Sequence, residues 1–95
     1  MSNARALLLD VGNTRLKWGV LENGRIRRTG VVAHSKLRDS GFGSLITRLP
    51  RRVDCVFASN VAGASFATRL SGVIGIHCGR SVHFAHCEKK GVRLD

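Results

Sequence analysis

The chain has 95 residues, 43% of them hydrophobic, which allows one small domain with a thin core and excludes a disordered tail. Lys and Arg number 16 against 6 Asp and Glu, and a net charge of +10 could attract nucleic acid, an anionic membrane or nucleotides. The basic residues are scattered and form only short pairs, so a solvated basic surface is favoured over such a partner. No apolar run approaches the ~18 residues that span a bilayer, and the N-terminus lacks the apolar region of a signal peptide. We therefore expect a cytoplasmic protein that does not contact membranes. Its three cysteines have no framework spacing, which suits reduced thiols.

The first 22 residues predict a tight β-hairpin. An apolar strand over residues 5–11 runs into a turn at Gly12-Asn13-Thr14, and a second strand over residues 16–22 returns from it. In this register Asp10 lies opposite Lys17, and opposed residues share one face of the sheet. The other face would form core and carries these apolar residues: Leu7, Leu9, Val11, Leu16, Trp18 and Val20.

The polar face of this hairpin could bind a phosphate. A carboxylate and an ammonium, from Asp10 and Lys17, would stand beside a turn that offers free backbone N–H groups. Such a turn can cradle a metal-bound polyphosphate. The alternative is an ordinary cross-strand ion pair on an exposed surface, worth well under ~1 kcal/mol, and the spacing does not decide between the two. Neither a P-loop nor a G-x-G-x-x-G motif is present.

The remaining elements follow in a regular order. Asn23-Gly24 predicts a second hairpin turn, which pairs Glu22 with Arg25. After it we expect a third strand over 25–33, a helix over 36–49 capped by Ser35, a strand over 54–59, a helix over 62–73 or beyond, and a strand over 81–87. The order β-β-β-α-β-α-β predicts an α/β fold with one mixed sheet, whose later strands are joined by crossover helices.

Two other groups of residues are candidate sites. Five potential zinc ligands lie close together, but their spacing is not that of a zinc finger, so a strand with incidental histidines is favoured: His77, Cys78, His83, His86 and Cys87. The arginines Arg25, Arg27 and Arg28 could line a nucleic-acid groove. The favoured alternative is the polar face of an edge strand, where charge discourages pairing with another chain.

The string from Leu9 to Trp18, LDVGNTRLKW, resembles the opening phosphate-binding motif of type III pantothenate kinases, the Bvg accessory factor family. The order of elements is similar to the first half of the actin-like (ribonuclease H-like) ATPase domain of that family. Ala58-Ser59-Asn60-Val61 and Gly91-Val92-Arg93 are weaker matches. On this resemblance residues 1–95 form the N-terminal part of an actin-like ATP-binding domain, ending before the segment that carries the catalytic aspartate and binds pantothenate.

The resemblance also implies roles for individual residues. Asp10 would help to hold Mg²⁺, and the ATP phosphates would be bound along the motif by Asp10, Val11, Gly12, Asn13, Thr14, Arg15, Leu16 and Lys17. Family members phosphorylate pantothenate with ATP, the first step of coenzyme A synthesis, and use a monovalent cation, K⁺ or NH₄⁺. The full-length form is expected to be a homodimer. No catalytic residue is expected in this chain, so residues 1–95 alone should be inactive.

Two rival functions remain open from the sequence. The first is a small basic nucleic-acid-binding protein that happens to carry a polar hairpin. The second is a non-catalytic nucleotide-binding remnant that keeps the phosphate hairpin and has lost the rest. Binding that depends on Asp10 favours a nucleotide, whereas steeply salt-dependent binding that depends on the arginines favours nucleic acid.

Overall fold

The computed structural model describes residues 4–85, 87–88 and 91–92. The strands are β1 (Arg5–Val11), β2 (Arg15–Glu22), β3 (Arg25–Ala33), β4 (Cys55–Asn60), β5 (Val82–Phe84), β6 (Cys87–Glu88) and β7 (Gly91–Val92). The helices are α1 (His34–Ser40), α2 (Gly43–Ile46) and α3 (Ala64–Cys78). No helix in the described ranges is long and apolar enough to cross a membrane.

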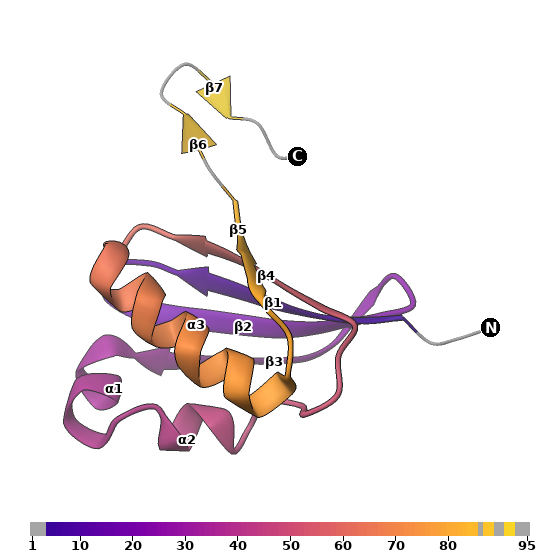
Figure 1. Ribbon diagram of the computed structural model, residues 1–95, viewed down its shortest axis with the longest axis horizontal. Coiled ribbons are helices and arrows are strands. Elements are labelled where there is room, and N and C mark those ends of the chain that lie inside the picture. Colours follow the sequence, from indigo (N-terminus) through magenta and orange to yellow (C-terminus); the bar gives the residue numbers. More distant parts are fainter. Residues whose placement is uncertain (1–3, 86, 89–90, 93–95) are drawn as a thin grey trace.

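Five strands form one mixed sheet in the order β3-β2-β1-β4-β5 (Figure 1). Strands β1, β2 and β3 are antiparallel neighbours, and β1, β4 and β5 run parallel. The parallel strands are reached through helical crossovers, as parallel pairing requires. This confirms the predicted α/β fold with a mixed sheet, in the order of elements expected of an actin-like half-domain. Strands β6 and β7 form a separate two-stranded ribbon.

The first hairpin has the predicted register. Asp10 lies opposite Lys17, Val11 opposite Leu16 and Leu9 opposite Trp18. The alternation follows from this pairing, because side chains on successive strand residues point to opposite faces. All six residues assigned to the apolar face are buried: Leu7, Leu9, Val11, Leu16, Trp18 and Val20.

The second hairpin also matches its prediction, with one irregularity. Asn23 and Gly24 have φ angles of 51° and 80°, as a tight turn requires, and Glu22 pairs with Arg25. The register then shifts, because Leu21 pairs with Ile26 but Val20 pairs with Arg28. Arg27 is therefore the extra residue of a β-bulge, which the regular alternation did not predict.

The three helices cover one face of the sheet, the one nearer the viewer in Figure 1. Leu37 of α1, Leu45 of α2, and Leu70 and Ile74 of α3 are at most 2% exposed and share one core with the apolar face of the sheet. Aromatic side chains connect α1 to α3, where Phe66 of α3 stacks on His34 of α1 with 4.7 Å between ring centroids. Burial of these side chains is the main stabilising term of the fold.

The predicted helix over 36–49 is wrong in two respects. Gly41 has a φ of 78°, which ends α1 after Ser40, and a separate short helix follows. Ser35 is not the cap, because α1 begins at His34, two residues before the predicted start, and Ala33 holds the N-cap position without a side-chain hydrogen bond. Gly41 and Gly43 are poor helix formers, and they were the feature of the sequence that indicated this break.

The two later elements differ from their predicted bounds. Helix α3 begins two residues later than expected and continues to Cys78, where Gly79 ends it with a φ of 69°. The predicted strand over 81–87 is shorter, because β5 stops at Phe84.

Of the five potential zinc ligands, His86 and the Cys87 side chain lie outside the described residues. In the part of the chain that is described, no three potential ligands converge. Two of the five are engaged at the end of α3, where His77 Nε2 lies 3.0 Å from the Leu49 carbonyl and the Cys78 thiol donates to the Pro50 carbonyl at 3.5 Å.

The opposite face of the sheet carries no helix among the described residues. Its strands expose large apolar side chains, with Ile26 52%, Val31 49% and Phe57 49% accessible. Asp10 and Lys17 lie on this same face, since each follows or precedes a residue of the buried face. The polar residues of the first hairpin therefore lie on this uncovered face of the sheet, which we call the bare face.

Candidate phosphate-binding site

The candidate site lies at the edge of the sheet where β1 and β4 end and β2 begins, on the left of Figure 1. Ligands of open α/β sheets bind outside the carboxyl ends of the parallel strands, where backbone groups of the connecting loops are free. Two loops meet here, the turn from β1 to β2 and the connection from β4 to α3. The N–H of Val61 in the second loop donates to the carbonyl of Val11 at 3.0 Å, which holds the loops together.

The β1–β2 turn is closed by backbone hydrogen bonds at its ends. Gly12 N–H donates to the Arg15 carbonyl at 2.9 Å, and His34 N–H donates to the Thr14 carbonyl at 2.8 Å. Within the described chain, the N–H groups of Asn13 and Thr14 donate to no backbone carbonyl, and both residues are exposed. Two free amides on a fixed turn are suited to bind an anion.

Asp10 and Lys17 do not pair with each other. They are opposed across the hairpin, yet neither belongs to an ion pair of the described residues. Instead, Asp10 Oδ1 accepts a hydrogen bond from Ser59 Oγ at 3.0 Å. Ser59 stands next to Asp10 because β1 and β4 pair in parallel with these two residues in register. The hairpin is therefore not the simple cross-strand ion pair that the sequence left open.

The loop from β4 to α3 is shaped by Asn60. Its side-chain oxygen accepts from Ala62 N–H at 3.2 Å, and its side-chain nitrogen donates to the Gly63 carbonyl at 3.0 Å. Gly63 has a φ of 103°, a conformation that side chains rarely adopt, and α3 begins at the next residue. The asparagine thus fixes the path of the backbone between Ser59 and the helix.

The eight residues predicted to bind phosphate fall into two groups. Val11 and Leu16 are 1% and 0% exposed on the helix-covered face, so only their backbone groups can reach a ligand. The others lie at the turn or on the bare face, where Gly12 is half-buried and the rest are exposed: Asp10, Gly12, Asn13, Thr14, Arg15 and Lys17.

Sequence reasoning did not assign Ser59 to the site. Its role depends on the parallel register between β1 and β4, which no local pattern specifies. The available signal was its position at the end of a short buried strand, which is where the polar residues of such sheets gather.

The sheet topology and the site at the carboxyl ends of β1 and β4 define a mixed α/β half-domain with a polar hairpin after its first strand. The chain belongs to the type III pantothenate kinase family, whose model matches residues 6–94.

Curated relatives agree with this assignment. The type III pantothenate kinase of Aromatoleum aromaticum is 33% identical over 90 residues, which are 92% of this chain and 35% of that protein. The Azoarcus sp. enzyme is 38% identical over 92 residues and the Burkholderia cenocepacia enzyme 39% over 69 residues, which cover 33% and 25% of those proteins. The chain thus spans about a third or less of the length of these relatives.

Among solved structures, two of the Aquifex aeolicus PPX–GPPA enzyme cover 87% of this chain and 36% and 35% of theirs. Their TM-scores are 0.45 and 0.44, at 13% and 14% identity. The family assignment therefore rests on the sequence matches.

Proposed function

We propose that this chain is the ATP-binding part of a kinase that phosphorylates pantothenate to 4'-phosphopantothenate, the first step of coenzyme A synthesis. The observation that carries the proposal is the arrangement at the first hairpin. Asp10 is held by Ser59, Lys17 is unpaired among the described residues, and the amides of Asn13 and Thr14 are free. A kinase needs such groups because phosphoryl transfer depends on positioning and on charge stabilisation.

Each group has a distinct task in the proposal. The amides of Asn13 and Thr14 bind phosphate oxygens, and Lys17 adds positive charge beside them. The side chain of Ser59 donates to Oδ1 of Asp10 and so fixes the rotamer of the carboxylate. Arg15 and the Gly12 backbone complete the rim of the turn. No residue of the chain is proposed to take the proton from the pantothenate hydroxyl.

The residues fit a magnesium ion bound together with ATP. Mg²⁺ is commonly held by one or two carboxylates, substrate phosphates and water, so it does not require a cage of protein ligands. Asp10 is exposed, and one of its oxygens is engaged by Ser59, which leaves the other available to the ion or its water. When bound, the metal would neutralise phosphate charge. The monovalent cation, the cytoplasmic location and the homodimeric full-length form belong to the proposal through the family alone.

The first test is nucleotide binding by calorimetry with Mg²⁺–ATP. Asp10→Ala and Lys17→Ala should each weaken binding at least about tenfold, since each removes a charge that faces the phosphates. Asp39→Ala and Lys36→Ala remove the same charges from exposed positions on α1 and should leave binding unchanged. Equal affinities for all five proteins would refute the proposed site.

The second test concerns catalysis. Residues 1–95 alone should produce no pantothenate-dependent ADP, because one wall of a cleft can neither orient the hydroxyl nor exclude water. Pantothenate-dependent ADP production by the purified 95-residue chain would contradict this. A full-length family member that carries this segment should be active and should lose activity with Asp10→Ala.

The nucleic-acid alternative makes the opposite prediction. It requires oligonucleotide binding that weakens steeply with salt and ignores Asp10→Ala. Such binding, in the absence of binding to Mg²⁺–ATP, would replace the kinase proposal.

A further inference from the structure

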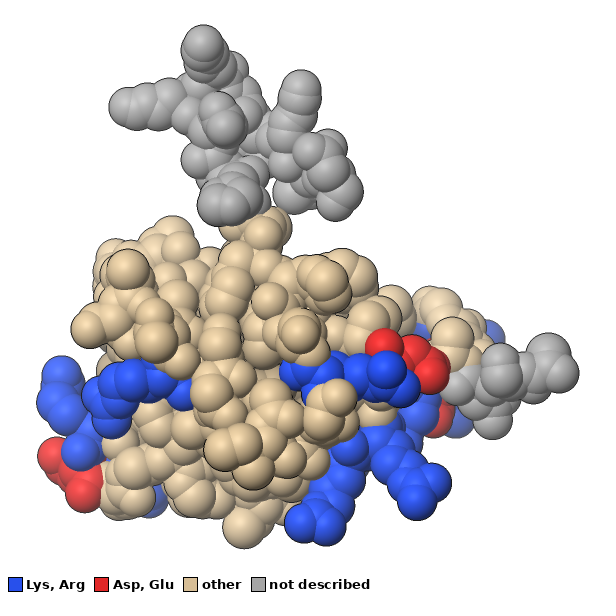
Figure 2. All heavy atoms as spheres, in the orientation of Figure 1, with Lys and Arg blue, Asp and Glu red and all other residues tan. Residues whose placement is uncertain are grey.

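A second cationic region lies at the opposite end of the sheet, where β1, β4 and β5 begin. Lys and Arg side chains gather at this end, on the right of Figure 2, around a few acidic groups. A cavity of about 430 Å³ opens here. It is lined by Arg5, Arg51, Arg52, Val53, Asp54, Cys78 and Arg80, and we call it the arginine cavity.

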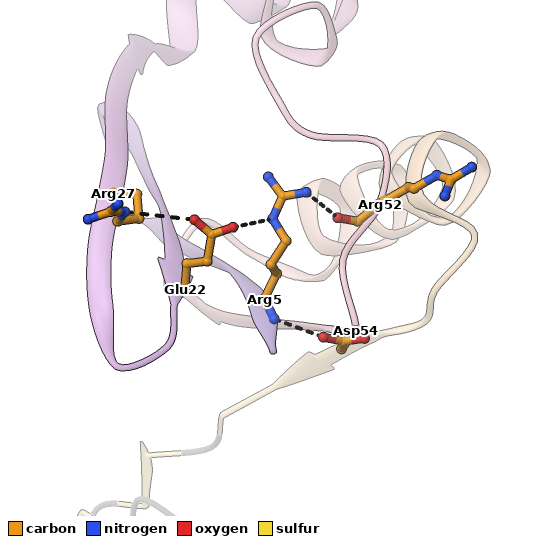
Figure 3. A network of polar contacts seen from close by, with 5 residues as sticks. All are labelled: Arg5, Glu22, Arg27, Arg52 and Asp54. Carbon is orange, nitrogen blue, oxygen red and sulfur yellow. Dashed lines mark hydrogen bonds and ion pairs between the residues drawn. The ribbon is translucent and has the colours of Figure 1, made fainter. Parts of the chain in front are cut away.

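Two of the four guanidinium groups are held in place by the fold. Arg5 NH1 donates to the Arg52 carbonyl at 3.1 Å, and its Nε lies 3.1 Å from Glu22 Oε2 (Figure 3). Arg80 Nε donates to the Val53 carbonyl at 3.2 Å. Each of these groups keeps further N–H donors for another partner, because a guanidinium carries five. The cavity therefore has a partly preorganised set of donors.

The acidic groups nearby are already engaged. Glu22 lies between two arginines, with its second oxygen 3.7 Å from Arg27 Nε. Asp54 Oδ2 accepts a hydrogen bond from the Arg5 backbone N–H at 2.8 Å. In the described ranges no carboxylate lies within ion-pair distance of Arg51, Arg52 or Arg80.

The Arg52 side chain points away from Arg5 and Glu22 in Figure 3, and it lines the cavity together with Arg80. The lining of the cavity thus carries four arginines and one carboxylate, and Arg51, Arg52 and Arg80 have no ion-pair partner in the described chain.

We propose that the arginine cavity binds a small phosphate-bearing molecule with at least two negative charges. Guanidinium groups match phosphate oxygens by paired hydrogen bonds, which favours phosphate over a simple halide. The cavity volume is sufficient for two linked phosphoryl groups but is small for a macromolecule. The ligand would relieve the repulsion among the arginines and would join the starts of β1 and β4 to the end of α3.

This site is separate from the phosphate hairpin. Arg5 and Val11 are the two ends of β1, so about 20 Å of strand lies between the cavity and the turn. A molecule of the size that fits the cavity cannot contact both. Binding at the arginine cavity therefore does not require binding of ATP at the phosphate hairpin.

The test is calorimetry with inorganic pyrophosphate in buffer without divalent metal, at low ionic strength. Arg51→Gln/Arg52→Gln removes two exposed charges from the cavity, and we expect affinity to fall at least about tenfold. Arg25→Gln/Arg38→Gln removes two exposed arginines that do not line the cavity, and we expect little change. Circular dichroism checks that each variant is folded.

Three results would overturn the proposal. One is the absence of pyrophosphate binding by the unmodified chain. Another is an equal loss of affinity in both double variants, which would indicate diffuse attraction to the basic surface. The third is loss of binding in Lys17→Ala but not in Arg51→Gln/Arg52→Gln, which would assign the pyrophosphate to the hairpin. Retained binding in Lys17→Ala together with loss in Arg51→Gln/Arg52→Gln supports the arginine cavity.

Discussion

On one face of β1, Leu7 and Leu9 are covered by helices, whereas on the other face Leu8 is half-buried and Asp10 is exposed. The side chains of the covered face pack in one core with buried residues of all three helices. The bare face contributes Asp10 and, from β4, its partner Ser59. If the proposed phosphate site is correct, alternation along one strand assigns some of its residues to the core and others to ligand binding. Substitutions on the bare face should therefore change binding at little cost in stability.

The largest effect is expected from a pair of neighbouring leucines. Leu7→Ala removes a side chain that is 0% exposed and should lower the free energy of unfolding by about 2–5 kcal/mol. Leu8→Ala makes the same chemical change on the bare face, where the side chain is half-buried, and should cost about 1 kcal/mol or less. Urea unfolding of both variants measures the difference. Equal costs would mean that the bare face is covered in solution.

A smaller loss of stability is expected at Gly30. A Cβ built there would lie 2.5 Å from Nε1 and Cε2 of Trp18, so the ring or the strand must shift. We expect Gly30→Ala to lower the free energy of unfolding by about 1–3 kcal/mol. Gly43→Ala is a suitable control, because nothing lies within 4 Å of a Cβ added at that position. Trp18 is the only tryptophan, so its fluorescence should report the displacement.

The smallest effect concerns Cys78, the last residue of α3, which lines the arginine cavity. Burial raises the pKa of this thiol above its ordinary value of 9.0. The protonated thiol is therefore favoured in the folded protein. Its contribution to stability is complete below pH 9 and is lost as the pH rises through the higher folded pKa. The unmodified protein should lose slightly more stability than Cys78→Ala between about pH 8 and pH 10, and parallel pH profiles would contradict this.

Local patterns were sufficient to predict both hairpins. Asp10 opposite Lys17 follows from strand alternation around a short turn, and Asn23-Gly24 specifies its own turn by positive φ angles. The break at Gly41 was not predicted, because a glycine is compatible with both a helix and its end until packing selects one.

Residues that meet only in the folded sheet could not be assigned. Ser59 reaches Asp10 through a parallel pairing of strands that are 49 positions apart. The arginine cavity also depends on tertiary structure, since Arg5, Arg52 and Arg80 come from three separate segments. The sequence showed the arginines as scattered pairs and gave no reason to place them together.

The central claim is that the hairpin on the bare face binds nucleotide phosphates. The most direct measurement is a titration of the ¹⁵N-labelled chain with Mg²⁺–ATP, followed by two-dimensional NMR. We predict that the amide signals of Asn13 and Thr14 shift with ligand concentration, and that Asp10→Ala removes these shifts. Unchanged signals at the turn, or shifts confined to residues around Arg51 and Arg80, would contradict the claim.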